Sequence, residues 1–247
     1  MSAFVLRVIA CVVMLIDHIG FQYGIAFFRQ LGRIAFPIFV FLICNGYRHT
    51  SSPLRYGLRL GIFALISQVP YSLFCYNLLW QDKGNVFMTL FLSLVCIWWT
   101  DRFWKKKNLR YLAFIPALVI CALYYFQVLD SDYGIRGIGF AFVFFYFAKE
   151  KKSKPWALVV GMLVAIYHGF ILDCVKWFVF GRAVSFPMLS SWEITQVYSL
   201  FALPLILKYN GKKGNMPAAP VAGKLTQLGF YLFYPAHMLA LWLIRVL

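Results

Sequence analysis

The sequence predicts an all-α protein that crosses a membrane several times and forms one helical bundle. Hydrophobic residues make up 62% of the 247 residues and only 13% are charged, whereas about a quarter of a soluble chain is charged. The apolar residues also gather in long runs. At about 20 apolar residues per span, this length accommodates about eight to ten spans and leaves no room for a separate soluble domain. We therefore expect a single domain, residues 1–247, whose chemistry takes place in the spans or their short loops.

Nine apolar runs define the expected spans. They are residues 3–23, 32–47, 57–76, 86–100, 110–128, 135–148, 155–178, 194–208 and 225–246. The first is a span rather than a cleavable signal, because Asp17 and His18 interrupt its apolar run and no small-residue cleavage site follows. The runs at 86–100 and 135–148 are short, so we expect one of them to be tilted, half-inserted or extended into its loop. The total is therefore about nine, within a range of eight to ten.

The later runs carry features of a packed bundle. The seventh run has a small residue at every fourth position, which lets a neighbouring helix approach closely. These residues are Ala157, Gly161, Ala165 and Gly169. A polar, turn-rich loop at 209–220 connects the last two runs.

Positive charge is distributed unequally between the two sets of loops. Most of the 24 Lys and Arg lie before the first run or after the second, fourth, sixth and eighth runs, whereas most Asp and Glu lie in the other loops. Because cytoplasmic loops carry an excess of Lys and Arg, we expect a cytoplasmic N-terminus and a location in the cell's inner (cytoplasmic) membrane. The formal charge of +16 then records the orientation of the spans in the lipid bilayer, and we expect no nucleic-acid partner.

Several polar side chains are expected at similar depth inside the membrane. Arg7 and His18 are separated by ten residues, or about 16 Å along a helix, which takes the chain from the cytoplasmic headgroups to near mid-membrane. The same rise per residue places His168 and His237 about 20 Å from the cytoplasmic side, and Gln68 comes out at a comparable level. Ionisable groups at this depth are energetically expensive and usually functional.

Three interpretations of these histidines remain open from the residues alone. Each imidazole donates to a backbone carbonyl in the bundle core, or one of them acts as a general base, or two or three of them bind haem iron or another metal. Asp17 is next to His18 and so lies about 100° around the helix. We therefore expect Asp17 to pair with Arg33 or with another helix rather than to orient His18.

A compact basic cluster follows the second run. It consists of Arg48, His49, Arg55 and Arg59. Anionic lipid headgroups explain scattered loop lysines, but guanidinium groups in a tight set also suit the phosphates of a specific ligand.

Nine short motifs spread over nearly the whole chain resemble the TraX family. They are Asp17–Gly20, Gly32–Phe39, Asn45–Thr50, Arg59–Leu60, Ser67–Tyr71, Asn85–Leu90, Asp132–Gly134, Tyr209–Gly211 and Tyr231–His237. That family is linked to conjugation and to N-acetylation of pilin, and it is grouped with transmembrane acyltransferases. The spacing of Arg7 and His18 also resembles the Arg/Lys-x10-His signature of acyltransferase-3 proteins.

The resemblance implies acetyl transfer from cytoplasmic acetyl-CoA to an acceptor hydroxyl or amine in or beyond the membrane, without a metal. His18 is then the expected base, and His237, or less readily His168 or Gln68, orients it or stabilises the oxyanion, with Asp17 in the same candidate site. The CoA phosphates are expected at Arg7, Arg48, His49, Arg55 and Arg59. Arg33, Asp132 and Glu193, on the outer side, are the expected contacts for the acceptor, which is the pilin N-terminus, an envelope glycan or peptide, or a small molecule.

Two other classes of function fit the same polar interior. A transporter or a pilus-assembly scaffold would use it as a pathway or a contact surface. A haem-binding electron carrier would use histidines as axial ligands, although the usual pairs of histidines on two helices are absent from the sequence.

Overall fold

The computed structural model describes residues 1–148, 153–181, 185–214 and 220–247. Lys149, Lys151 and Lys152, which belong to the predicted cytoplasmic set, lie outside the described residues, as does Arg182. Within the described residues the chain is helical, and the only strand-like pairing is one isolated bridge between Gly84 and Ser131.

Each predicted apolar run falls on a helix. The first five helices are α1 (Ala3–Tyr23), α2 (Ala26–Gly32), α3 (Ala35–His49), α4 (Pro53–Tyr76) and α5 (Val86–Trp104). The next segments are the 3-10 helix η1 (Lys107–Leu112), α6 (Ile115–Tyr125), α7 (Gly134–Phe147) and α8 (Pro155–Phe180). The last segments are α9 (Ser191–Gln196), η3 (Val197–Ala202), α10 (Leu203–Leu207) and α11 (Pro220–Val246). The predicted all-α membrane bundle is therefore confirmed.

Seven helical segments among the described residues are long and apolar enough to cross a membrane. The remaining two predicted spans are shorter: α7 has 14 residues, and the segment 191–207 is assembled from α9, η3 and α10. The run at 86–100 is not short in the structure, because α5 continues to Trp104 within the basic loop. The second span begins earlier than predicted, since α2 and α3 together form a 24-residue segment, Ala26–His49, broken near Arg33.

Local capping explains where several helices begin and end. The side chains of Ser2, Ser52 and Asn85 accept hydrogen bonds from backbone N–H groups in the first turns of α1, α4 and α5. Gly24 and Asn77 end α1 and α4 in the left-handed conformation, with φ of 69° and 56°.

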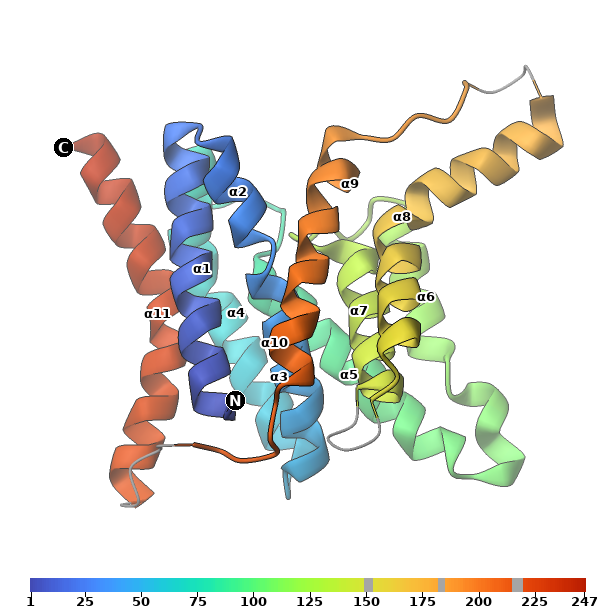
Figure 1. Cartoon of the computed structure of the whole chain (residues 1–247), viewed down its shortest axis with the longest axis horizontal. Helices are drawn as coiled ribbons and strands as arrows, with labels where there is room; N and C mark the ends of the chain where they lie inside the picture. Colours follow the sequence, from blue (N-terminus) through green and yellow to red (C-terminus); the bar gives the residue numbers. More distant parts are fainter. Residues whose placement is uncertain (149–152, 182–184, 215–219) are drawn as a thin grey trace.

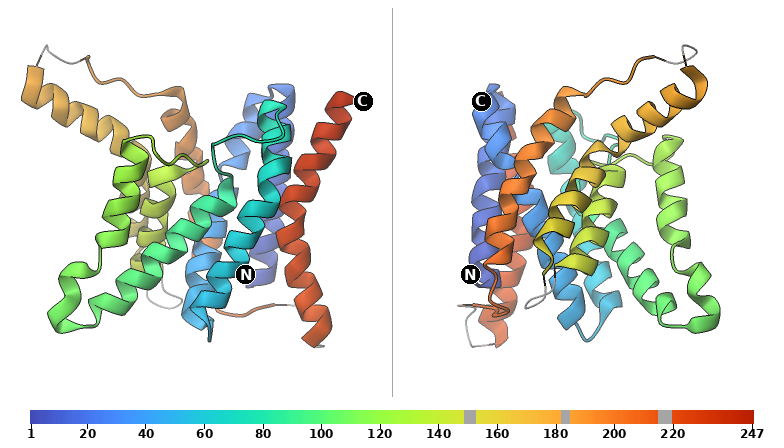
Figure 2. Two further views of the ribbon diagram at one scale, coloured as in Figure 1. Left: turned by 180° about the vertical axis from the view of Figure 1, so that it is seen from behind. Right: turned by 45° about the vertical axis from the view of Figure 1, so that its right-hand side comes forward.

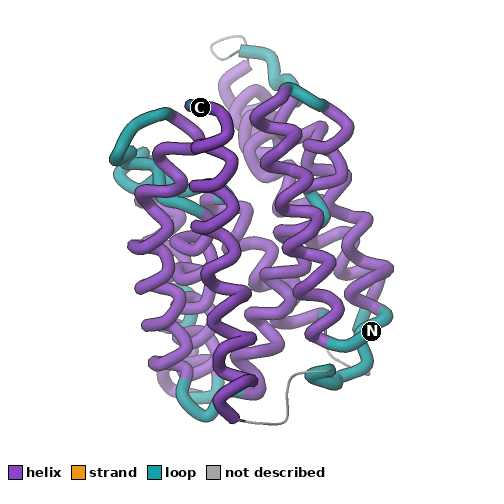
Figure 3. Tube along the Cα trace, turned by 90° about the vertical axis from the view of Figure 1, so that its left-hand side faces the viewer, coloured by secondary structure: helices purple, strands orange, loops and turns teal. Residues whose placement is uncertain are grey.

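Successive segments run in alternating directions between the two ends of the bundle (Figure 1). The N-terminus lies at the lower end of Figure 1 and the C-terminus at the upper end, and Figure 3 shows the loops gathered at these two ends. In the left view of Figure 2, α4 lies between α11 and α5, against both of which it packs. The loops after α3, α5 and α10 share the end of the N-terminus, which we call the basic end. That the basic end faces the cytoplasm stays a prediction.

Candidate active site

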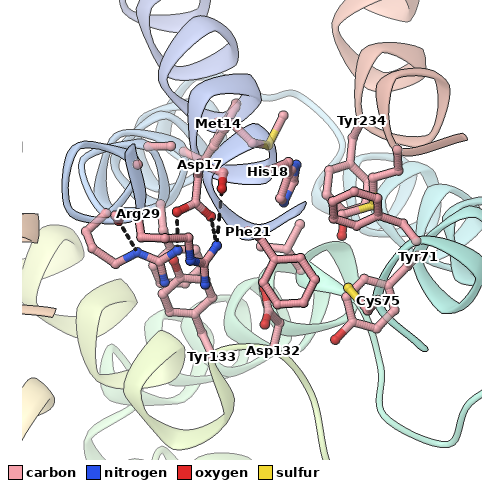
Figure 4. Close-up of a pocket in the computed structure, with 18 of the residues that line it drawn as sticks. Met14, Asp17, His18, Phe21, Arg29, Tyr71, Cys75, Asp132, Tyr133 and Tyr234 are labelled. Carbon is pink, nitrogen blue, oxygen red and sulfur yellow. Dashed lines mark hydrogen bonds and ion pairs between the residues drawn. The ribbon is translucent and has the colours of Figure 1, made fainter. Parts of the chain in front are cut away.

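A cavity of about 320 Å³ opens inside the bundle among α1, α2, α3, α4 and α11. We call it the His18 cavity, because His18 is on its wall. Asp17 and Arg29 lie on one side of it and Tyr71, Cys75 and Tyr234 on another, with His18 between them (Figure 4). Arg33 also lines this cavity. It therefore combines a titratable imidazole with charged groups and aromatic walls, as binding and catalytic sites do.

Two of the three histidines predicted at similar depth, His18 and His237, are in direct contact. Nδ1 of His18 lies 2.6 Å from Nε2 of His237, and Nδ1 of His237 lies 2.6 Å from the carbonyl oxygen of Phe233. A carbonyl oxygen only accepts, so Nδ1 of His237 carries a proton and, in the neutral ring, its Nε2 accepts from Nδ1 of His18. The hydrogen-bond network thus assigns the tautomers and leaves Nε2 of His18 with a free lone pair.

Burial separates the roles that these two imidazoles can take. His18 is half-buried on the cavity wall, whereas His237 is 8% exposed and is not among the cavity-lining residues. The planes of the two rings are nearly parallel, at 17°, with centroids 4.9 Å apart, and Phe74 meets His18 edge-on at 5.4 Å. His18 is placed to meet a reactant, and His237 is placed to hold His18.

Asp17 is held by two arginines. Its carboxylate is 2.7 Å from Arg29 and also forms an ion pair with Arg33, so the pairing with Arg33 expected from helix geometry is present. Gly32 makes this approach possible, because a Cβ at that position would lie 2.1 Å from the Cβ of Asp17. The buried carboxylate is therefore compensated by charge and fixes α2 against α1.

Asp132 enters the same cavity from the loop between α6 and α7. The N–H of Gly84 donates to the carbonyl of Asp130 and the N–H of Asp132 donates to the carbonyl of Gly84, which joins this loop to the segment carrying Lys83. The Asp132 side chain is exposed toward the cavity. Partial desolvation by the protein around the cavity raises the pKa of the Asp132 carboxyl, against the opposite influence of Arg33 and Lys83.

A second cavity, of about 340 Å³, lies toward the basic end. We call it the Arg7 cavity. Its basic residues are Arg7, His49, Arg59 and Lys213, and no acidic side chain lines it among the described residues. Lys213 reaches this position because the N–H groups of Ala3 and Phe4 donate to the carbonyls of Lys212 and Lys213.

Two of the predicted phosphate contacts lie elsewhere. Arg48 donates to the carbonyls of Phe144, Phe145 and Ala148, so its guanidinium is engaged at the end of α7. Arg55 is exposed and lines neither cavity.

His168, Gln68 and Glu193 do not join the histidine pair either. Nδ1 of His168 is 3.1 Å from the carbonyl of Ala165, which matches the interpretation of a core histidine. The Gln68 amide bonds the carbonyls of Gln81 and Lys83 and the side chain of Asn85, and so supports the loop before α5. Glu193 completes a capping box with Ser190 and lies 3.8 Å from Arg136.

Several cavity residues were not singled out by sequence reasoning. They are Phe39, Tyr71, Lys83, Tyr133, Lys213 and Tyr234. The aromatic ones fall inside the motifs Gly32–Phe39, Ser67–Tyr71, Asp132–Gly134 and Tyr231–His237, so the motifs were the available signal. Lys213 carries no such signal, because only folding brings the loop after α10 back to α1.

Comparison with known proteins supports a family assignment. The chain is 26% identical over 253 residues to a probable fimbrial assembly protein FimC, serogroup H1, of Dichelobacter nodosus, covering 96% of this chain and 93% of the relative. It is 25% identical over 165 residues to an uncharacterized protein of Rickettsia prowazekii (strain Madrid E), covering 66% of this chain and 62% of that protein. No solved structure matches. The family described as TraX protein matches residues 2–245, and this chain belongs to that family.

Proposed function

We propose that the protein is an integral membrane acetyltransferase that moves an acetyl group from cytoplasmic acetyl-CoA to an acceptor hydroxyl or amine. The observation that carries this proposal is the hydrogen-bond chain from His18 through His237 to the Phe233 carbonyl. It leaves Nε2 of His18 as an unprotonated base on the wall of a cavity. The inner cytoplasmic membrane is the location that this reaction requires, because acetyl-CoA is supplied by the cytoplasm.

The reaction needs no acyl-enzyme. Nε2 of His18 takes the proton from the acceptor O–H or N–H as that oxygen or nitrogen attacks the thioester carbonyl carbon. The tetrahedral intermediate then breaks its carbon–sulfur bond, and the CoA thiolate takes the proton back from His18 and leaves as the free thiol. His237 keeps accepting from Nδ1 of His18 throughout and so holds the base in one tautomer.

The Arg7 cavity suits the donor. Guanidinium and ammonium groups without an acidic neighbour on the cavity wall attract the phosphates of CoA, and Arg7, Arg59 and Lys213 supply these groups. Arg7 and His18 lie on the same helix about 16 Å apart along its axis, which is comparable to the length of an extended pantetheine arm. With the phosphates at Arg7, the thioester thus extends toward His18.

The His18 cavity suits the acceptor. Asp132 and Lys83 offer opposite charges to a polar group, beside Arg33 and the ring of Trp192. The acceptor class stays open among a pilin N-terminal amine, an envelope glycan or peptide, and a small molecule. The name of the Dichelobacter relative favours a fimbrial protein.

That name also favours a second candidate, a scaffold for fimbrial or pilus assembly or a related transport function without acetyl transfer.

The distance between the two histidines argues against the haem alternative. A metal between two imidazole nitrogens holds them about 4 Å apart, because each metal–nitrogen bond is about 2.0–2.1 Å. Nδ1 of His18 and Nε2 of His237 are only 2.6 Å apart.

The test uses purified protein in lipid nanodiscs with labelled acetyl-CoA and a series of peptide amines and sugar hydroxyls. We expect transfer to at least one acceptor class, and a loss of about a hundredfold or more in His18→Gln with acetyl-CoA binding retained. His168→Gln, a histidine outside the cavities, is the matched control and should keep full activity. A wild-type protein that neither binds CoA nor transfers acetyl would contradict the enzyme. A His18→Gln variant that still supports assembly in cells would favour the scaffold.

A further inference from the structure

One residue forms part of the wall of both cavities. Phe39, on α3, lines the His18 cavity together with Val86 and lines the Arg7 cavity together with Phe87. Val86 and Phe87 are consecutive, so the two cavities come close to each other at this point. Helix α11 also contributes to both cavities, because its Tyr231 lines the Arg7 cavity and its Tyr234 lines the His18 cavity.

The rings around this wall differ in how firmly they are held. Phe87 is 8% exposed and packs against Tyr231, Tyr234 and Phe63, with ring centroids 5.9, 5.3 and 6.0 Å away. Phe39 is half-buried, and no aromatic ring pair among the described residues includes it. Among the described rings of this wall, Phe39 is therefore the one that no other ring holds in place, and it packs against the core only as a partly buried side chain.

We propose that Phe39 is a gate between the Arg7 cavity and the His18 cavity, a role that rests on the proposed function. In the structure the ring lies in the wall that the two cavities share. A change of rotamer opens it for the narrow pantetheine arm, and the arm itself then fills the opening. The gate lets the thioester reach His18 and keeps the two cavities separate when no donor is bound.

Enlarging the side chain tests the passage of the thioester. Phe39→Trp should lower kcat for acetyl transfer about tenfold or more, with little change in acetyl-CoA affinity, because the phosphates bind below the gate. Phe41→Trp is the matched control on the same helix, since Phe41 faces Phe144 and Tyr209 and lines neither cavity. Full transfer by Phe39→Trp would overturn the gate.

Removing the side chain tests the separation of the cavities without relying on catalysis. Cys75 lines the His18 cavity and serves as a reporter after the other five cysteines are replaced. A small membrane-impermeant thiol reagent is added on the side of the basic end, and Lys213→Cys confirms that it reaches the Arg7 cavity. Cys75 should be protected from the reagent when Phe39 is present and labelled in Phe39→Ala. In the control variant Phe41→Ala it should stay protected. If Phe41→Ala does not fold, Phe41→Leu takes its place as the control.

The two readouts separate the two proposals. If the reagent added at the basic end labels Cys75 equally in the otherwise native chain and in Phe39→Ala, the gate is overturned, even if acetyl transfer is found. Absence of CoA binding and acetyl transfer in the wild type, with Cys75 exposed only in Phe39→Ala, would overturn the acetyltransferase and keep Phe39 as the partition between two cavities.

Discussion

The two cavities differ in how their charges are compensated. In the His18 cavity, the Asp17 carboxylate pairs with Arg29 and Arg33, so much of the charge is used to hold α2 against α1. In the Arg7 cavity, Arg7, Arg59 and Lys213 face no acidic side chain on the described wall. Charges that compensate each other within the protein contribute to folding, whereas positive charges without an acidic partner on the wall favour a negatively charged ligand. Mutations of the Asp17 ion-pair cluster should therefore reduce stability, and mutations of the basic residues in the Arg7 cavity should reduce ligand binding.

The largest expected effect is on stability, at Asp17. Asp17→Ala leaves two arginines, one of them buried, without their carboxylate, so we expect a loss of about 3–5 kcal/mol in the free energy of unfolding. Thermal unfolding in detergent measures it. Asp173→Ala, which breaks an exposed pair with Lys176, is the control and should lose no more than about 1 kcal/mol. Equal losses in both variants would show that the Asp17 cluster does not stabilise the fold.

The next largest effect is on turnover, at His237. His237→Ala removes the acceptor for Nδ1 of His18, so the base loses its fixed tautomer and orientation, and we expect kcat to fall up to about a hundredfold. The KM for acetyl-CoA should change little, because His237 lies outside the Arg7 cavity. Steady-state kinetics over a range of pH checks this, since a change in the pH profile distinguishes the positioning of His18 from a general loss of folded protein. An unchanged kcat would remove His237 from the mechanism.

A smaller effect is expected on donor binding, at Arg7 and Lys213. Neutralising either one, in Arg7→Gln or Lys213→Gln, removes a charge-assisted contact and should weaken acetyl-CoA binding about tenfold, with an unchanged Tm. Calorimetric titration at two salt concentrations should also show a smaller salt dependence in both variants. Arg55→Gln is the control, because Arg55 is exposed and lines neither cavity. If Arg55→Gln weakened acetyl-CoA binding as much as Arg7→Gln, the assignment of the CoA phosphates to the Arg7 cavity would be wrong.

The sequence predicted the bundle well because span location depends on local composition. All nine apolar runs became helices, and the largest differences at their ends arose where α2 extends the second span and where α11 begins at Pro220, ahead of the predicted residue 225. The rise per residue likewise placed His18 and His237 at one depth, where they meet.

Depth along a helix does not determine which way a side chain faces. His168 was predicted at the same depth as His237, yet it bonds the carbonyl of Ala165 on its own helix, because the packing of α8 sets its direction. Arg48 belongs to a compact arginine cluster in the sequence, but in the fold it meets the end of α7. In the sequence Lys213 does not differ from other loop lysines, and only the backbone hydrogen bonds of its loop with α1 bring it to the Arg7 cavity. These assignments depend on contacts between distant segments, which composition and spacing do not contain.

The smallest predicted effect is on stability at Asp132, and it opposes the one at Asp17. Asp132 lies in a loop outside the spans, and desolvation by the surrounding protein raises its pKa, so its charged form is less favourable in the folded protein than in the unfolded chain. Below the unfolded pKa, about 3.9, both states are protonated and no penalty exists; the penalty grows as pH rises toward the folded pKa and is then constant. Asp132→Asn should therefore raise Tm at pH 8 and leave it nearly unchanged near pH 4, as measured by thermal unfolding at both values. A lower Tm for Asp132→Asn at pH 8 would contradict this prediction. It would mean that Arg33 and Lys83 stabilise the Asp132 carboxylate, as Arg29 and Arg33 stabilise that of Asp17. Asp132 would then contribute to folding rather than being available to a ligand.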